Sequence, residues 1–132
     1  MEAKKMNIWL IDDDEIYIYT AQKCIEQLSY IADLKIFKNA DLALEALKNE
    51  STDKPNVIFL DLHMPVMSGW QFVTEFANFN LINTKLFVVT SSIDESDMKE
   101  AKKHTVVTAY LLKPVTPHHY KDILDNLLEY KD

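Results

Sequence analysis

Four short apolar runs of this chain each end in a polar residue, and this feature most constrains how the chain can fold. The runs are rich in β-branched and aromatic residues, which is typical of buried parallel strands. They end at Asp12, Asp61, Thr90 and Lys113. Ligands of an open parallel sheet bind just beyond the carboxyl ends of its strands. We therefore expect acids, a hydroxyl and an amine to meet in one crevice, where they are suited to hold a divalent cation and a phosphoryl group.

Strand-like and helix-like segments alternate along the whole chain. The predicted strands are residues 6–11, 34–37, 57–60, 86–89 and 108–112. The predicted helices lie near residues 15–28, 40–47, 68–79, 95–104 and 116–128. Five βα units predict an α/β fold, a flavodoxin-like doubly wound (βα)5 three-layer sandwich with parallel strand order 2-1-3-4-5. This order places the first strand beside the third, so Asp12, Asp13 and Asp61 become neighbours.

Length and composition predict one domain that neither binds nucleic acid nor spans a membrane. We expect residues 1–132 to form one domain around a single core, with residues 1–5 as candidates for a flexible start. The net charge of −7 argues against a surface that binds nucleic acid. The first apolar stretch is too short to span a membrane. The lone Cys24 cannot form an internal disulfide, which fits a reducing compartment, so we expect a cytoplasmic protein.

A single glycine, Gly69, limits how phosphate can be bound. Dinucleotide-binding, Walker-type and kinase glycine loops each need more than one glycine. Side chains and a metal must therefore hold any phosphoryl group. Gly69 itself is expected to permit a turn or close packing after Asp61.

Four segments together resemble the receiver domain of two-component response regulators, the family that includes the chemotaxis response regulator. The segments are Leu10-Ile11-Asp12-Asp13-Asp14-Glu15, Asp61-Leu62-His63-Met64-Pro65-Val66-Met67-Ser68-Gly69, Val88-Val89-Thr90-Ser91-Ser92 and Tyr110-Leu111-Leu112-Lys113-Pro114. The D-x-x-M-P-x-x-x-G stretch is the most specific of them. All four occur in order at predicted strand ends, and the resemblance covers essentially the whole chain.

The resemblance implies a phosphoacceptor and a metal site. Asp61 would accept the phosphoryl group on its carboxylate. Asp13, Asp61 and the backbone carbonyl of His63 would bind Mg²⁺, with Mn²⁺ as an alternative ion, and Asp12 would act mainly through a bound water. A metal site is also expected on physical grounds, because a carboxylate that attacks an anionic phosphoryl group needs a cation between the two. Mg²⁺ prefers oxygen ligands of this kind.

Three more residues complete the set that the resemblance implies. Lys113 would contact the acceptor carboxylate and later the phosphoryl oxygens, and the Lys113–Pro114 bond would be cis. Thr90 would move its hydroxyl onto the phosphoryl group, and Tyr110 would then swing into the vacated space as a switch residue. The alternatives are an ordinary strand-end residue for Thr90 and a half-buried edge-strand aromatic for Tyr110. Asp14 is expected to cap the following helix.

Two positions near the expected acceptor bear on the lifetime of the phosphoryl group. In the family, the positions of His63 and Ser92 flank the route of a hydrolytic water, and the His63 ring either positions that water or points to solvent. We expect Trp70 to be a packing residue and His104 to lie on the surface. The predicted helix over residues 95–104 is poor in apolar residues, which indicates low local stability.

The resemblance implies a stand-alone phosphoacceptor signalling protein rather than an enzyme, one that assists its own phosphorylation and dephosphorylation. A histidine kinase or phosphotransfer protein would act upstream. A downstream protein would bind the face made by the fourth helix, the fifth strand and the fifth helix, with the receiver as a monomer or weak dimer. Ile16 and Tyr19 point away from the core stripe of the first helix. We expect them to dock the kinase together with the loop at Pro114.

Other functions remain as alternatives. A haloacid-dehalogenase-like phosphatase also uses an aspartyl phosphate and Mg²⁺, and Asp12-x-Asp14 would supply its nucleophile, Asp12, and its acid. Against it, Ile16 stands where that class has Thr or Val. The phosphorylated residue separates the two, because it is Asp61 in a receiver. The scarcity of glycine disfavours a flavodoxin-like electron carrier, and the complete acid, Thr and Lys set disfavours a degenerate receiver used only for interactions.

Overall fold

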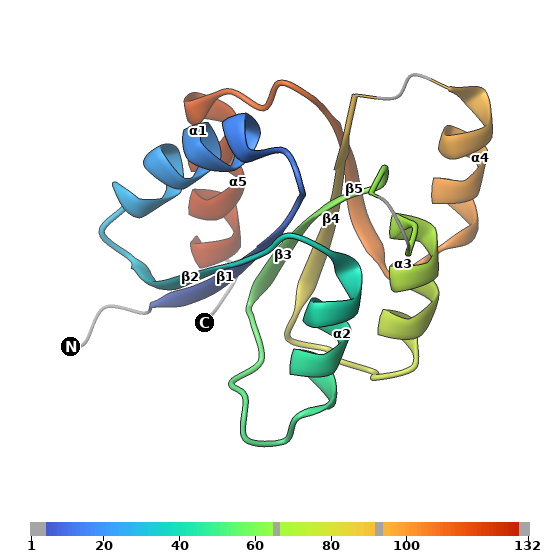
Figure 1. Ribbon diagram of the computed structural model, residues 1–132. Coiled ribbons are helices and arrows are strands. Elements are labelled where there is room, and N and C mark those ends of the chain that lie inside the picture. Colours follow the sequence, from blue (N-terminus) through green and yellow to red (C-terminus); the bar gives the residue numbers. More distant parts are fainter. Residues whose placement is uncertain (1–4, 65–66, 92–93, 130–132) are drawn as a thin grey trace.

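A parallel five-stranded sheet lies between two layers of helices in the computed structural model (Figure 1), which describes residues 5–64, 67–91 and 94–129. The strands are β1 (Met6–Ile11), β2 (Ile31–Phe37), β3 (Val57–Asp61), β4 (Lys85–Thr90) and β5 (Val107–Leu112). The helices are α1 (Glu15–Glu26), α2 (Ala40–Lys48), α3 (Gly69–Ala77), α4 (Glu95–Lys103) and α5 (Pro117–Glu129). The strand order β2-β1-β3-β4-β5 confirms the predicted fold. Apart from Lys5, the expected flexible start lies outside the described residues.

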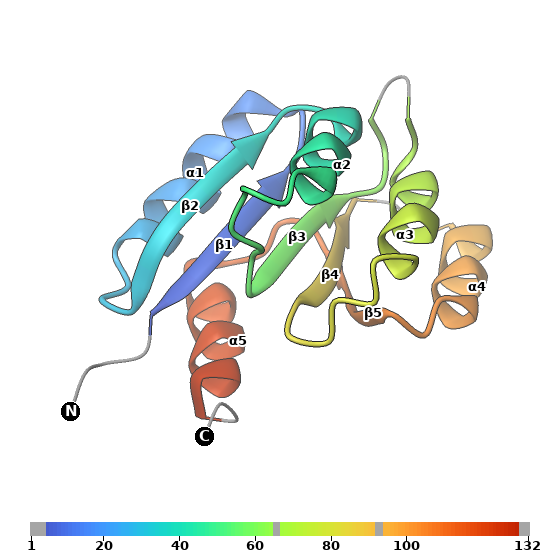
Figure 2. The ribbon, with the colours of Figure 1, turned by 90° about the horizontal axis from the view of Figure 1, so that it is seen from below.

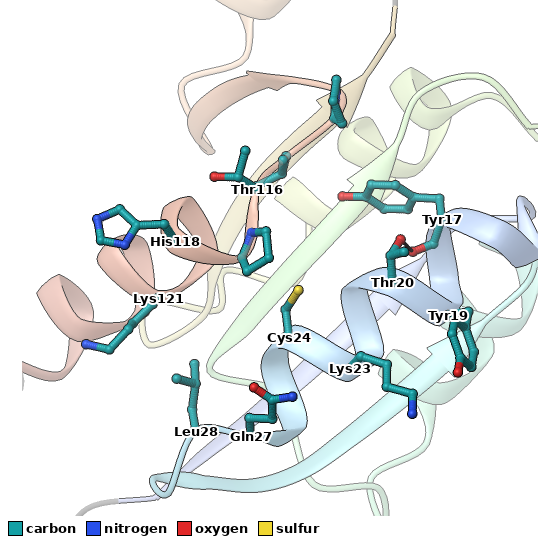
Figure 3. Close-up of a pocket in the computed structure, with 13 residues that line it drawn as sticks. Tyr17, Tyr19, Thr20, Lys23, Cys24, Gln27, Leu28, Thr116, His118 and Lys121 are labelled. Carbon is teal, nitrogen blue, oxygen red and sulfur yellow. Dashed lines mark hydrogen bonds between the residues drawn. The ribbon is translucent and has the colours of Figure 1, made fainter.

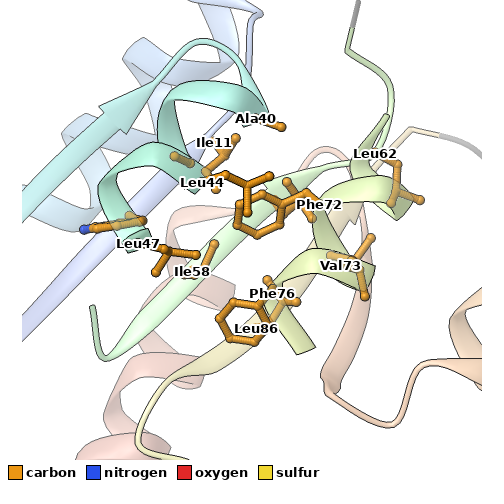
Figure 4. Packing of buried hydrophobic residues seen from close by; sticks show 14 of the residues in the cluster. Ile11, Ala40, Leu44, Leu47, Ile58, Leu62, Phe72, Val73, Phe76 and Leu86 are labelled. Carbon is orange, nitrogen blue, oxygen red and sulfur yellow. The ribbon is translucent and has the colours of Figure 1, made fainter. Parts of the chain in front are cut away.

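Each face of the sheet is covered by its own helices, as Figures 1 and 2 show. On one face, α1 and α5 pack on apolar side chains of β1, β3 and β4. This cluster includes Ile8, Leu10, Ile18, Ile25, Phe59, Tyr120 and Leu124. On the other face, α2 and α3 do the same (Figure 4), and this second cluster includes Trp9, Ile11, Leu44, Leu47, Ile58, Phe72 and Phe76. Strands buried on both faces explain the continuous apolar runs of the sequence.

The ends of several elements differ from the sequence prediction. β2 begins at Ile31 rather than residue 34, because this edge strand exposes Ala32 and Asp33 and so lacks a continuous apolar run. α1 ends at Glu26, although the partly buried Leu28 continues its stripe. α3 begins at Gly69, because Ser68 is its N-cap within a capping box.

The fourth helix is the least anchored of the described helices. α4 buries none of its residues. Met98, an apolar residue of this helix, is 50% exposed. A helix with few buried contacts opens easily, so α4 lies at the low-stability end of the fold. Within the described ranges, no helix is both long and apolar enough to cross a membrane.

The register of the central strands positions the polar residues. β1 pairs with β3 in parallel, with Ile11 opposite Leu60. Asp12 and Asp61 follow these partners directly, so both residues lie side by side at the carboxyl ends of the strands. β4 lies next to β3, and its last residue is Thr90. The predicted meeting point of the polar side chains therefore lies where β1 and β3 end.

Candidate functional site

Three carboxylates gather at the ends of β1 and β3. Oxygens of Asp12, Asp13 and Asp61 all lie within 4.8 Å of one another, with Asp12 and Asp61 buried and Asp13 exposed. One oxygen of Asp12, Oδ1, accepts the backbone N–H of Asp14 at 2.9 Å. The other, Oδ2, is buried without a hydrogen-bond donor among the described residues. Three clustered carboxylates fit a hard divalent cation, which prefers oxygen ligands.

The environment of Asp61 disfavours the ionised form of its carboxyl group. Burial, and then the negative charge of Asp12, raise the pKa of Asp61 to about 6. The ammonium of Lys113 and the backbone N–H of His63, which donates to Oδ1 at 3.3 Å, act in the opposite direction. Asp61 is only 6% exposed, so water compensates little. A cation at the cluster would relieve this destabilisation.

Lys113 supplies the positive charge of the site. Its Nζ lies 2.8 Å from Oδ2 of Asp12 but 3.8 Å from Oδ2 of Asp61, so it contacts the Asp12 carboxylate more closely than the expected acceptor. The shorter contact is an ion pair without hydrogen-bond alignment, since the same Asp12 oxygen lacks a donor. The Lys113–Pro114 bond is cis, as the resemblance implied. The backbone N–H of Lys113 donates to the carbonyl of Thr90 at 2.9 Å.

The two predicted switch residues lie at different depths. Thr90 ends β4 and is fully buried beside β3. Tyr110 lies on β5 opposite Val88, partly buried against the α2–α3 side of the core. It lines a small hollow of about 310 Å³ between α4 and β5. The structure therefore places Tyr110 beside α4.

A network of side chains ties α4 to the loop after Asp61. Asp97 on α4 lies 3.1 Å from Nε2 of His63 and accepts the indole N–H of Trp70 at 3.0 Å. The Trp70 ring stacks on His104, with ring centroids 5.3 Å apart. The expectation that His104 lies on the surface is wrong, because the side chain is 19% exposed and pairs with Glu100 at 3.0 Å. Ser92, predicted to flank the water route, lies outside the described residues.

Gly69 brings the start of α3 against the end of β3. A Cβ at this position would lie 2.6 Å from the Cα of Leu62 and 2.9 Å from the carbonyl oxygen of Asp61. Its backbone N–H donates to the carbonyl of Leu62 at 2.9 Å. No side chain fits there without a backbone shift, which confirms the expected close packing.

The predicted docking residues lie around a groove between α1 and the start of α5. The groove has a volume of about 820 Å³, and Tyr19 and Pro114 line it (Figure 3). Tyr19 is 60% exposed, and Ile16 is 80% exposed and lies on α1 outside the described lining. Exposed apolar side chains beside a groove are typical of an interaction surface.

Comparisons with known proteins agree with this geometry. The response regulator receiver domain matches residues 8–125. An uncharacterized response regulatory protein of Shewanella oneidensis is 34% identical over 106 residues, which are 80% of this chain and 42% of that protein. The chemotaxis protein CheY of Halobacterium salinarum is 25% identical over 121 residues, covering 92% of this chain and 95% of that protein. A crystal structure of a two-component response regulator from Cytophaga hutchinsonii has a TM-score of 0.81 at 22% identity, covering 96% of this chain and 99% of that one.

The chain belongs to the family of response regulator receiver domains. Such domains are signalling phosphoacceptors of two-component systems that work with histidine kinases or phosphotransfer proteins. The chain spans less than half of the Shewanella protein. The phosphatase alternative gains no support, and Asp14, its required acid, instead accepts the backbone N–H groups of Ile16 and Tyr17 as the N-cap of α1.

Two residues at the site were missed from the sequence. No functional role was expected for Tyr17, yet its ring lies under the ammonium of Lys113. Asp97 belongs to a helix that the sequence shows as largely polar. The signal for Asp97 was its place in the first turn of α4, but nothing in the sequence pairs it with His63 or Trp70.

Proposed function

We propose that this chain accepts a phosphoryl group on Asp61 and thereby switches a protein-binding face. The observation that carries the proposal is the convergence of Asp12, Asp13 and Asp61 within 4.8 Å, with Lys113 alongside. Three carboxylates and one ammonium leave an excess of negative charge in a largely buried site. Such a site is suited to a divalent cation and then to a phosphoryl group that bridges the cation and the lysine.

Asp13, Asp61 and the carbonyl of His63 would hold Mg²⁺, with Asp12 acting through a water. Mn²⁺ accepts the same oxygen ligands and would serve in its place. When bound, the ion would neutralise charge on the carboxylates and on the incoming phosphoryl group. The convergence of the three carboxylates supports a cation at this position.

The transfer is a displacement at phosphorus. An oxygen of the Asp61 carboxylate attacks the phosphorus in line, the new P–O bond forms, and the bond from phosphorus to the donor breaks. The donor leaves with the electron pair of that bond. Lys113, 3.8 Å from Asp61 before transfer, would contact the phosphoryl oxygens afterwards. Thr90 would then turn its hydroxyl toward them, and Tyr110 would follow.

The partners are part of the proposal. A histidine kinase or phosphotransfer protein would dock at Ile16, Tyr19 and Pro114, beside the groove between α1 and α5. A downstream protein would bind the face of α4, β5 and α5. The low stability of α4 and its link to the loop after Asp61 through Asp97 support an output at this face.

The test is incubation with acetyl phosphate and Mg²⁺, followed by intact mass and peptide mapping. We expect one added phosphoryl group on Asp61, absent in Asp61→Asn and in the presence of EDTA. Asp12→Asn, which keeps Asp61, is expected to be modified slowly and still at Asp61. Modification at Asp12, or none in the unchanged protein, would contradict the proposal.

A further inference from the structure

Tyr17 lies between the carboxylate site and the groove, and the function proposed above gives it no role. The centroid of its ring is 4.2 Å from Nζ of Lys113. The same side chain lines the groove between α1 and α5, where Figure 3 shows it close to Thr20. Tyr17 therefore contacts Lys113 from the side of α1 and forms part of the wall between the ammonium and the groove.

Apart from this ring, the ammonium of Lys113 contacts, among the described residues, the carboxylates of Asp12 and Asp61. The side chain is 15% exposed, its contact with Asp12 is not aligned as a hydrogen bond, and Asp61 is 3.8 Å away. An ammonium group carries only donors on a flexible stem. An aromatic face attracts such a cation, and more strongly where both are shielded from water. The ring of Tyr17 supplies that face.

The ring is itself held in place. The hydroxyl of Tyr17 is hydrogen-bonded to that of Tyr120, which is buried on α5. The Tyr120 ring packs edge-on against Phe59 of β3 at 5.1 Å and 86°. Burial raises the pKa of Tyr17, so the ring stays neutral at ordinary pH. Its position is thus tied to the strand that ends in Asp61.

We propose that Tyr17 is a positioning residue that holds the ammonium of Lys113 beside Asp61 through the face of its ring. The inference rests on the proposed function, in which Lys113 contacts the phosphoryl oxygens. Tyr17 touches no reacting atom and acts through Lys113. The ring, rather than the hydroxyl, carries the effect.

The contact can be tested without any phosphoryl transfer. In protein with isotope-labelled lysine, the Lys113→Arg variant identifies the ε-methylene resonance of Lys113 by its disappearance. We expect the ring current of Tyr17 to shift this resonance upfield of the surface lysines. Tyr17→Phe retains the shift, and Tyr17→Leu abolishes it. A Lys113 resonance among those of surface lysines in the unchanged protein would overturn the proposal.

The consequence for transfer is tested with acetyl phosphate over a range of concentrations. Tyr17→Leu is expected to lower the rate at saturating donor about five- to tenfold, while the Mg²⁺ affinity stays unchanged. Tyr17→Met also removes the ring and gives the same result if the Leu variant does not fold. Tyr17→Phe restores the rate, and Tyr120→Phe is the matched control, since it removes the hydroxyl pair and leaves the Tyr17 ring.

Failure of this inference and failure of the proposed function give different results. Ring-less variants that are phosphorylated as fast as the unchanged protein would show that Tyr17 does not position Lys113. Failure of the unchanged protein to be modified at Asp61 would instead defeat the proposed function, and the Lys113 resonance would still decide the contact.

Discussion

Asp12 lies closer to the ammonium of Lys113 than Asp61 does, at 2.8 Å against 3.8 Å. The two buried carboxylates thus interact with one ammonium group, and Asp61 is stabilised less by it than Asp12 because Asp61 lies farther away. The raised pKa of Asp61, about 6, agrees with this unequal sharing. A divalent cation at the cluster would supply the missing positive charge and free Lys113 to contact another anion.

Removing the charge of Asp61 should stabilise the metal-free protein. Folding raises the pKa of Asp61 from 3.8 to about 6, so the folded state binds the proton more tightly than the unfolded state. The contribution of this group to stability is full below the unfolded pKa and is lost as the pH rises through the folded pKa. At about 1.4 kcal/mol per pKa unit, we expect Asp61→Asn to be more stable than the unchanged protein by about 1–3 kcal/mol near pH 8, but not near pH 4.

Urea unfolding in EDTA at a series of pH values measures this difference. Asp13→Asn, at the exposed carboxylate of the cluster, is the control and should gain less. If the free energies of unfolding of Asp61→Asn and the unchanged protein changed in parallel between about pH 4 and pH 8, burial would not destabilise the ionised form of Asp61.

Mg²⁺ should raise the thermal stability of the folded protein. The ligands are gathered only in the folded state, so the ion binds that state preferentially. At a hundredfold excess over Kd we expect Tm to rise by roughly 10 °C, as measured by calorimetry. EDTA should reverse the rise, and Asp13→Asn should remove most of it. An equal rise in Asp13→Asn would place the ion elsewhere.

Gly69→Ala should weaken both the fold and the site. The added Cβ would lie 2.6 Å from the Cα of Leu62, which must move and take the end of β3 with it. We expect a loss of about 1–3 kcal/mol in the free energy of unfolding and slower phosphorylation of Asp61. Ser68→Ala, which removes only the N-cap of α3, is the control and should cost about 1 kcal/mol without slowing phosphorylation. Equal phosphorylation rates in the two variants would argue against a special role for the close approach at Gly69.

Asp97→Ala should loosen the link between α4 and the loop after Asp61. Its carboxylate pairs with the rings of His63 and Trp70, and we expect its loss to cost about 1–2 kcal/mol. The tryptophan emission should shift as Trp70 gains access to water, whereas Trp9 is buried in the core. Glu95→Ala, an exposed carboxylate of the same helical turn, is the control. An emission spectrum identical to that of Glu95→Ala would contradict the link.

Ile16→Glu should slow phosphotransfer from a histidine kinase or phosphotransfer protein. A charge would replace an 80% exposed apolar side chain at the proposed docking surface. Full burial of such a side chain contributes about 1.5–3 kcal/mol, so we expect a loss of about tenfold or more in transfer. The rate with acetyl phosphate should not change. Leu42→Glu, at a 50% exposed residue on α2, is the control, and an equal effect of the two variants would rule out a specific docking role for Ile16.

The fold and the meeting of the carboxylates were predictable because they depend on backbone topology. Apolar runs that end in Asp12 and Asp61 determine which strand ends carry oxygen ligands, and the strand order brings them together. Side-chain contacts between distant segments were not predictable. The preference of Lys113 for Asp12 over Asp61 depends on side-chain torsions, which no sequence pattern encodes.

The contacts around α4 were hidden for a related reason. His104 was expected at the surface, yet it stacks on Trp70 of α3. Tyr17 fitted the apolar stripe of α1 and so attracted no other interpretation. Some polar and aromatic residues both pack in the core and contact the functional site. Their second role becomes visible only when the residues next to them in space are known.

Because α4 contributes no residue to the interior, folding places little demand on its amino acids. If α4 forms part of the face for a downstream protein, as proposed above, substitutions along its outer side would change which partner binds while leaving the fold intact. The choice of partner would then vary independently of the carboxylates and the lysine at the strand ends.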